Sequence, residues 1–132
     1  MSNPMIKDSG KRTTFQTGAV RDMQENKGRM DLLPMGALLE LSKHFEMGCQ
    51  KYGERNWEKG IELHAYVSSG LRHMAQFISN RNDEPHLTAT VWNFICLLDT
   101  IIKIKEGTLP KELNTLPIDL DELMLHWRKE ND

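Results

Sequence analysis

Apolar residues recur at helical spacing in three stretches of the chain. The first begins after Pro34, which suits the first turn of a helix because the N–H that proline lacks has no intrahelical partner there, and it is expected to end near residue 53. The second is expected over about residues 64–80 and the third over about residues 85–105. A shorter amphipathic stretch predicts a fourth helix near residues 119–129. Since no stretch alternates convincingly between apolar and polar residues, the pattern predicts an all-α fold, a helical bundle of about four helices.

The first third of the chain has a different character. It is polar and contains glycine, with almost no apolar periodicity, and this predicts an extended N-terminal arm over residues 15–33 that follows a mobile segment over residues 1–14. The core helices are expected within residues 34–105 and a C-terminal helix within residues 106–132. We therefore expect residues 1–132 to form a single domain.

Composition and charge restrict the classes to which the protein can belong. The chain has 132 residues, of which 39% are hydrophobic and 27% charged, so a soluble domain with a lean core is expected, and a homo-oligomer (dimer or larger) would bury more of its surface. A net charge of −2 excludes nucleic-acid binding through bulk charge. Neither a membrane-length apolar run nor a signal core is evident, and two cysteines within expected helices indicate a reducing compartment, so a cytoplasmic location is expected.

The third expected helix is apolar almost all round, which predicts a central, buried position. It nevertheless carries four polar residues on one narrow stripe: His86, Thr90, Asn93 and Thr100. A buried polar group without a partner costs about 1–3 kcal/mol. The stripe must therefore face either a ligand site or a set of interhelical hydrogen bonds.

The first expected helix has two polar sides. Glu40, His44 and Lys51 share one of them, where solvated charge is the favoured interpretation for Glu40. Glu46 lies on another side and borders the apolar seam. A carboxylate at such a border needs a cation, a metal or a network of donors, which favours a functional role for Glu46.

The segment between the second and third helices places Asp83, Glu84 and His86 within four residues. One of the two carboxylates can simply cap the helix that begins at Pro85. Carboxylates from two helices together with His86 would instead form a site for Mg²⁺ or Mn²⁺, because hard ions prefer oxygen ligands. His73 in the second helix is, taken alone, more typical of a core histidine than of a ligand.

The loop after the first helix combines cations with an aromatic ring. Lys51, Arg55 and Lys59 surround Trp57 and could hold a polyphosphate while the ring stacks on a base. A solvated loop explains the charges equally well but explains Trp57 poorly. The chain lacks the motifs of P-loop kinases, serine hydrolases and zinc proteases, and the absence of a His-Asp dipeptide disfavours an HD-type phosphohydrolase.

Several short motifs occur together over about residues 15–105. They are Phe15-x-Thr17-Gly18-Ala19-Val20-Arg21-Asp22, Lys27-Gly28-Arg29-x-Asp31-Leu32-Leu33-Pro34, His44-Phe45-Glu46-x-Gly48, Lys51-Tyr52-Gly53-x-Arg55-Asn56-Trp57-x-Lys59-Gly60, Arg72-His73, Asp83-Glu84-x-His86-Leu87 and Trp92-Asn93. In combination they resemble the bacteriophage dATP/dGTP diphosphohydrolase family, the MazZ-like enzymes. The resemblance implies that a purine deoxynucleoside triphosphate is hydrolysed to the monophosphate and pyrophosphate with a divalent metal, and that the chain is related to the all-α MazG-type pyrophosphohydrolases. The Glu-x-x-Glu motif of that wider superfamily is absent, since Cys49 stands three residues after Glu46.

The residues and the resemblance together suggest a set of roles. The expected metal ligands are Glu46, Asp83, Glu84 and His86, and the expected catalytic residues are Glu46, His73 and Glu84. The substrate would be bound through its phosphates by Lys51, Arg55 and Arg72, through its purine by Asn56, Trp57 or Asn93, and by Arg21, Arg29 and Asp31 of the arm. The alternative is a non-catalytic helical phage module that binds a nucleotide or a host protein. A phage-encoded enzyme would act in the cytoplasm of the host cell.

Overall fold

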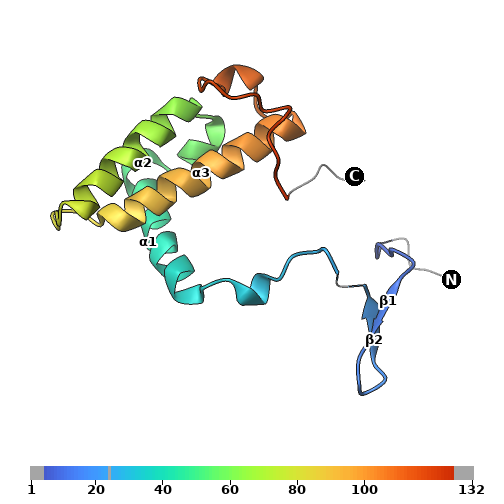
Figure 1. The fold of residues 1–132 in the computed structure, drawn as a ribbon. Coiled ribbons are helices and arrows are strands. Elements are labelled where there is room, and N and C mark those ends of the chain that lie inside the picture. Colours follow the sequence, from blue (N-terminus) through green and yellow to red (C-terminus); the bar gives the residue numbers. More distant parts are fainter. Residues whose placement is uncertain (1–4, 24, 127–132) are drawn as a thin grey trace. The chain divides into compact units, whose positions relative to one another are not determined.

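The computed structural model describes residues 5–23 and 25–126 of the protein. The chain divides into two compact units between Pro34 and Met35. The larger unit contains three α-helices, α1 (Met35–Tyr52), α2 (Leu63–Ile78) and α3 (His86–Glu106), drawn in Figure 1. The expected helical fold and the positions of its first three helices are therefore confirmed to within a few residues, whereas a fourth helix is not.

The smaller unit contains a two-stranded antiparallel sheet that the sequence pattern did not predict. Strands β1 (Arg12–Thr14) and β2 (Val20–Asp22) pair with Thr13 opposite Arg21. Gly18 has a φ of +88° in the connecting turn, a conformation that glycine adopts without steric cost. Strands of three residues are too short to show an alternating pattern of apolar and polar residues, which explains why the sequence predicted only an extended arm here. A 3₁₀ turn (Met30–Leu32) follows.

Helices α2 and α3 pack side by side along their lengths, with α1 against α3 (Figure 1). Leu63 of α2, Ile101 of α3 and Leu120 form the buried hydrophobic cluster. Further along, Gly70 of α2 lies against the ring of Phe94, where a β-carbon would come within 2.6 Å of the ring. Glycine at this position therefore lets the ring pack directly on the backbone of α2.

The polar stripe of α3 faces this interior, but most of it is satisfied by its own helix. Thr90, Asn93 and Thr100 each donate a side-chain hydrogen bond to the carbonyl four residues earlier, at 2.9, 2.8 and 2.7 Å. Such bonds satisfy buried polar groups without a partner helix or a ligand. Hydrogen bonds between helices are present as well: the hydroxyl of Thr90 also donates to the carbonyl of Gly70 on α2 at 3.5 Å, and His86 contacts His73 of α2. The interpretation as interhelical hydrogen bonds therefore holds for part of the stripe.

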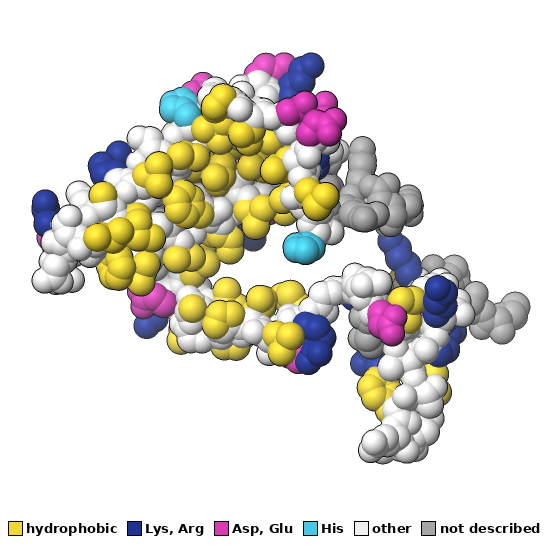
Figure 2. Space-filling model, viewed as in Figure 1, with side chains coloured by type: hydrophobic (Ala, Val, Ile, Leu, Met, Phe, Trp, Pro, Cys, Tyr) yellow, Lys and Arg dark blue, Asp and Glu magenta, His cyan; other side chains and the backbone are white. Residues whose placement is uncertain are grey.

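The side of α3 next to this interior face is apolar and half-exposed, contrary to the expectation of a central, buried helix. Leu87, Val91, Phe94 and Leu98, spaced by four, three and four residues, have exposed fractions of 36–46%. Figure 2 shows hydrophobic side chains spread over the helical unit. By length and composition α3 could cross a membrane, a test that a core helix of a soluble protein also passes. We name these four residues the α3 apolar stripe.

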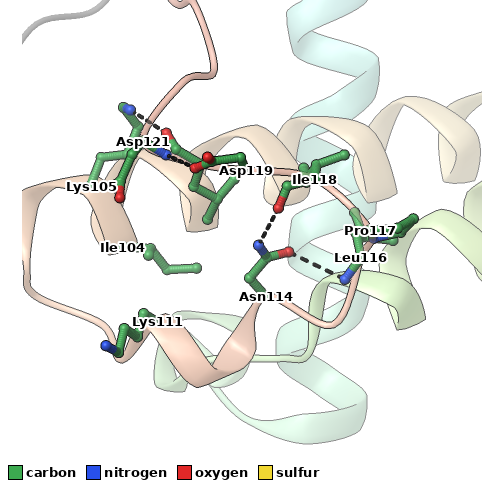
Figure 3. Close-up of a pocket in the computed structure, with 10 residues that line it drawn as sticks. Ile104, Lys105, Lys111, Asn114, Leu116, Pro117, Ile118, Asp119 and Asp121 are labelled. Atoms are coloured by element: carbon green, nitrogen blue, oxygen red, sulfur yellow. Dashed lines mark hydrogen bonds between the residues drawn. The ribbon is translucent and has the colours of Figure 1, made fainter.

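The expected fourth helix is not formed in the part of it that the structure describes, residues 119–126, and residues 127–129 lie outside the described residues. After a 3₁₀ turn (Lys111–Leu113), side chains replace helical hydrogen bonds: the Asn114 amide bonds the backbone of Leu116 and Ile118, and Asp119 accepts from the backbone N–H of Asp121 (Figure 3). Local bonds of this kind compete with helix formation. Leu120 is the buried anchor of the segment, and its carbonyl accepts a hydrogen bond from Lys105.

Candidate active site

A cluster of acidic and histidine side chains lies where α3 begins. Asp83, Glu84 and His86 each offer a possible ligand atom, and these atoms lie within 4.8 Å of one another. Both carboxylates are exposed, whereas His86 is buried. Residue Pro85 is the N-cap of α3 and no side chain caps it, so the capping role considered for one of the acids is not observed. The group could hold a metal ion.

His86 connects this segment to α2. One of its ring nitrogens, Nε2, lies 2.8 Å from a carboxylate oxygen of Asp83, and the other, Nδ1, lies 3.0 Å from Nδ1 of His73. The side chain of His86 is 1% exposed. The hydrogen bond from His86 lowers the pKa of Asp83, which keeps this carboxyl ionised. Burial, followed by the neighbouring His86, lowers the pKa of His73, which favours its neutral form.

Helix α1 contributes two residues that the sequence analysis did not assign to the site. The hydroxyl of Thr88 donates a hydrogen bond of 3.0 Å to the carboxylate of Glu40, which ties α1 to α3. His44, one turn after Glu40, has its pKa lowered first by burial and then by His73, while Glu40 and Glu84 oppose this shift. Within the described part of the chain, Nδ1 of His44 is buried without a hydrogen-bond partner. In the sequence, the spacing of four residues between Glu40 and His44 already places both on one face of the helix.

Glu46 is not part of this group. It is exposed on α1, two residues after His44, and successive helix residues turn by about 100°, so Glu46 points about 200° away from His44 around the axis. The sequence analysis placed it among the metal ligands and catalytic residues. The structure brings His44 near enough to His73 and Glu84 for their charges to act on its pKa, and it leaves Glu46 on another face of α1.

An aromatic cavity of about 270 Å³ lies between α1, the segment that follows α1 and Trp92 of α3. Phe45, Trp57 and Trp92 line it, with ring centroids 5.9 Å apart for Phe45–Trp57 and for Phe45–Trp92. The ring of His44 lies 5.9 Å from that of Trp92, so one side of Trp92 faces the histidines and another faces the cavity. Trp92 therefore links His44 to this cavity.

A short irregular segment forms one wall of this cavity. Arg55 has a φ of +57°, and the 3₁₀ turn that follows (Asn56–Lys59) brings Asn56 and Trp57 into the lining. The amino group of Lys103 lies 4.8 Å from the centre of the Trp57 ring, a cation–π distance. Arg55, Asn56 and Trp57 all line this cavity, and their binding of a nucleotide stays a prediction.

The three expected phosphate-binding cations have different surroundings. Arg55 lines the cavity and pairs with Glu58 at 2.8 Å. Lys51 is exposed near the end of α1. Arg72 is exposed next to His73, and its charge contributes to the lowered pKa of that histidine. Within the described residues no carboxylate lies at ion-pair distance from Arg72, so this guanidinium is available to an anionic ligand.

The remaining substrate-binding candidates are Asn93 of α3 and three residues of the N-terminal unit. Asn93 is 5% exposed, donates its amide to the carbonyl of Ala89 and does not line the aromatic cavity. Arg21 lies on β2 in the N-terminal unit. In the same unit Arg29 and Asp31 pair through two hydrogen bonds of 2.8 and 2.7 Å. Their contact with a nucleotide stays a prediction.

The chain matches one family of known proteins. No curated protein and no solved structure matches the chain significantly. A model of the family described as dATP/dGTP diphosphohydrolase, N-terminal, matches residues 17–108. This segment contains α1, α2 and α3 and hence the acidic cluster and the aromatic cavity. Because the match covers well over half of the chain, the protein belongs to the dATP/dGTP diphosphohydrolase N-terminal domain family.

Proposed function

We propose that the protein hydrolyses dGTP or dATP to the monophosphate and pyrophosphate with the help of a divalent metal ion. The observation that carries this proposal is that His44 links the two features: its ring lies 5.9 Å from that of Trp92, which lines the aromatic cavity, and the charge of Glu84 in the acidic cluster acts on its pKa. An aromatic cavity suits a nucleobase, and clustered carboxylates suit the cation that accompanies a triphosphate. The family match supports a purine deoxynucleotide as the substrate.

The donor set fits Mg²⁺ or Mn²⁺. Asp83 and Glu84 offer exposed carboxylates in the cluster. Carboxylate oxygens are the ligands that both ions prefer. A bound ion would neutralise negative charge on the phosphates and polarise the phosphorus that is attacked.

The side chains of the chain itself would position the substrate. Trp57 stacks on the purine and the amide of Asn56 can bond its edge. Arg72, with Arg55 and Lys51, binds phosphate oxygens through charge-assisted hydrogen bonds. Water held by Glu84 or His73 attacks the α-phosphorus, and the bond to the bridging oxygen breaks to release pyrophosphate.

A nucleotide panel with identified products tests this function. With Mg²⁺ or Mn²⁺ present, we expect dGTP or dATP to give monophosphate and pyrophosphate in equal amounts. Nucleotide binding without turnover would instead support a non-catalytic nucleotide-binding module. Release of intact triphosphate would show an HD-type reaction and would contradict the proposed bond cleavage.

Trp57→Ala should raise KM for the purine nucleotide by about 10-fold and change kcat less, because stacking on an aromatic ring contributes roughly 1–3 kcal/mol to binding. Trp57→Phe is the matched control, since it keeps a ring and should keep most of the affinity. Steady-state kinetics on both variants distinguish the roles. Equal KM values for Trp57→Ala and the unchanged protein would remove Trp57 from the base site.

A second copy of the chain is the proposed partner of the α3 apolar stripe. Four half-exposed apolar side chains in one row are typical of a helix that packs against another helix. Light scattering at micromolar concentration should give at least twice the monomer mass of 15.3 kDa. Val91→Glu should reduce the mass to that of a monomer. A monomeric mass for the unchanged protein would contradict this assembly.

A further inference from the structure

We propose that Lys103 is a positioning residue for the purine: its ammonium group holds the indole ring of Trp57 from outside the aromatic cavity, so that the ring is set in place before a base stacks on it. Lys103 itself needs no contact with the substrate. The inference deepens the proposed function and rests on it for the presence of a base in the cavity. The contact between Lys103 and Trp57 belongs to the folded protein and can be tested without any substrate.

Trp57 lines two neighbouring hollows of the helical unit. One is the aromatic cavity, and the other is a hollow of about 360 Å³ whose charged residues are Glu58, Asp99 and Lys103. Phe45 and Trp57 are the two residues that line both. Lys103 lines only the second hollow. A base in the aromatic cavity and the side chain of Lys103 would therefore reach the ring of Trp57 from different hollows.

The ammonium group of Lys103 is held at both ends of a short chain of contacts. Its Nζ lies over the indole of Trp57, 4.8 Å from the ring centre, and 3.0 Å from a carboxylate oxygen of Asp99 one helical turn earlier. The side chain of Lys103 is 28% exposed. A cation–π contact is stronger when the cation is partly removed from water. Asp99 therefore fixes the ammonium group, and the ammonium group fixes the ring.

The location of Trp57 explains why its ring needs such support. It lies in the 3₁₀ turn Asn56–Lys59, directly after the left-handed backbone of Arg55. Because so short a turn packs few side chains of its own, the orientation of the ring depends on contacts with the helices. Phe45 supports it from α1, with ring centroids 5.9 Å apart, and Lys103 supports it from α3. A ring that is already held loses less freedom when a ligand binds, which strengthens binding.

Two other roles for Lys103 lead to different expectations. A lysine in the last turn of a helix interacts favourably with the negative end of the helix dipole, so its removal would lower the melting temperature without weakening base binding. An ammonium group can also bind phosphate directly. In that case its removal would weaken only those ligands that carry phosphate. Ligands with and without phosphate therefore separate the three roles.

The direct test is the NMR signal of the methylene protons next to the ammonium group of Lys103. In the unchanged protein without metal or nucleotide, these protons should be shifted upfield by the ring current of the indole, because the ammonium group lies over the ring. Trp57→Leu should remove the shift. Methylene signals at ordinary positions in the unchanged protein would overturn the proposal. This measurement does not depend on the folding of a variant.

Binding of deoxyguanosine and deoxyadenosine, which carry no phosphate, tests the effect on the base. Lys103→Met keeps the length of the side chain but removes its charge, and it should raise the Kd of the nucleosides about 3- to 10-fold. The KM for dGTP or dATP should rise by the same factor with kcat nearly unchanged. Lys103→Arg should restore the affinity, because a guanidinium also stacks on aromatic rings. Lys111→Met, in an exposed turn outside both hollows, is the matched control for charge.

A double-mutant cycle shows whether Lys103 acts through Trp57. In a Trp57→Leu background, Lys103→Met should cause little further rise in KM, because the ring on which it acts is gone. Losses that add independently, a loss confined to the triphosphates, or unchanged nucleoside affinity with a lowered melting temperature would each overturn the proposal. If the unchanged protein binds neither nucleosides nor triphosphates, the proposed function fails and the role toward the base fails with it. The ring-current shifts would still show whether Lys103 holds Trp57.

Discussion

Glu84→Gln is expected to lower kcat for pyrophosphate release at least 100-fold and to weaken Mn²⁺ binding. The substitution keeps the size of the side chain but removes one of the charges that cluster within 4.8 Å at the start of α3. Loss of ion binding would leave phosphate charge uncompensated, a change of several kcal/mol in transition-state stabilisation. Kinetics together with a Mn²⁺ titration measure both effects.

Glu46→Gln is the informative comparison for this prediction. The sequence places Glu46 among the ligands, whereas the structure places it on another face of α1, away from His44. Normal Mn²⁺ affinity for Glu46→Gln and weak affinity for Glu84→Gln would support the group seen in the structure. The opposite result would restore the ligand set based on the sequence. Full activity in excess chelator would remove the metal from the mechanism altogether.

Arg72→Ala should lower kcat/KM by about 10- to 100-fold, because a charge-assisted hydrogen bond contributes roughly 1.5–3 kcal/mol. The side chain is exposed, next to His73, and has no carboxylate partner among the described residues, so its loss should leave the melting temperature nearly unchanged. Part of the loss should appear in kcat, since negative charge moves toward the leaving pyrophosphate during the reaction. Measuring kinetics and melting on the same samples separates these effects.

Two further variants refine the role of Arg72. Arg72→Lys should recover only part of the rate, because an ammonium group cannot reproduce the planar fork of a guanidinium. Lys111→Ala removes one positive charge from an exposed 3₁₀ turn outside the cluster and serves as the control for net charge. Equal losses in Arg72→Ala and Lys111→Ala would indicate a long-range charge effect and would take Arg72 out of the site.

The three helices could be predicted because their signals are local. Apolar spacing defines each helix, and Pro34 and Gly107 mark boundaries that the backbone respects, with Gly107 in the left-handed conformation after α3. The same reasoning predicted a C-terminal helix that is not formed in the described residues 119–126. Its apolar residues have helical spacing, but the side chains of Asn114 and Asp119 bond to the backbone and Leu120 inserts as a single anchor.

The site was only partly predictable, because sequence spacing says little about which helix faces meet. Asp83, Glu84 and His86 are neighbours in the chain, so their grouping was evident. Glu40 is exposed, as the sequence pattern indicates for a solvated carboxylate, and its hydrogen bond to Thr88 of α3 spans 48 residues. Only the packing of α1 against α3 shows that contact.

The back-bonded stripe of α3 has a consequence for how uniquely this fold is specified. Because Thr90, Asn93 and Thr100 each donate to a carbonyl of α3 itself, these three bonds do not restrict the sliding of α2 along α3. Two other contacts join the helices: the 3.0 Å contact between His73 and His86, and a second, longer hydrogen bond of 3.5 Å from Thr90 to the carbonyl of Gly70. A buried polar contact of this kind can select one register among several apolar packings of similar free energy. The histidine pair would then align the two helices as well as the reacting groups, which ties the precision of the chemistry to the register of the helical hairpin.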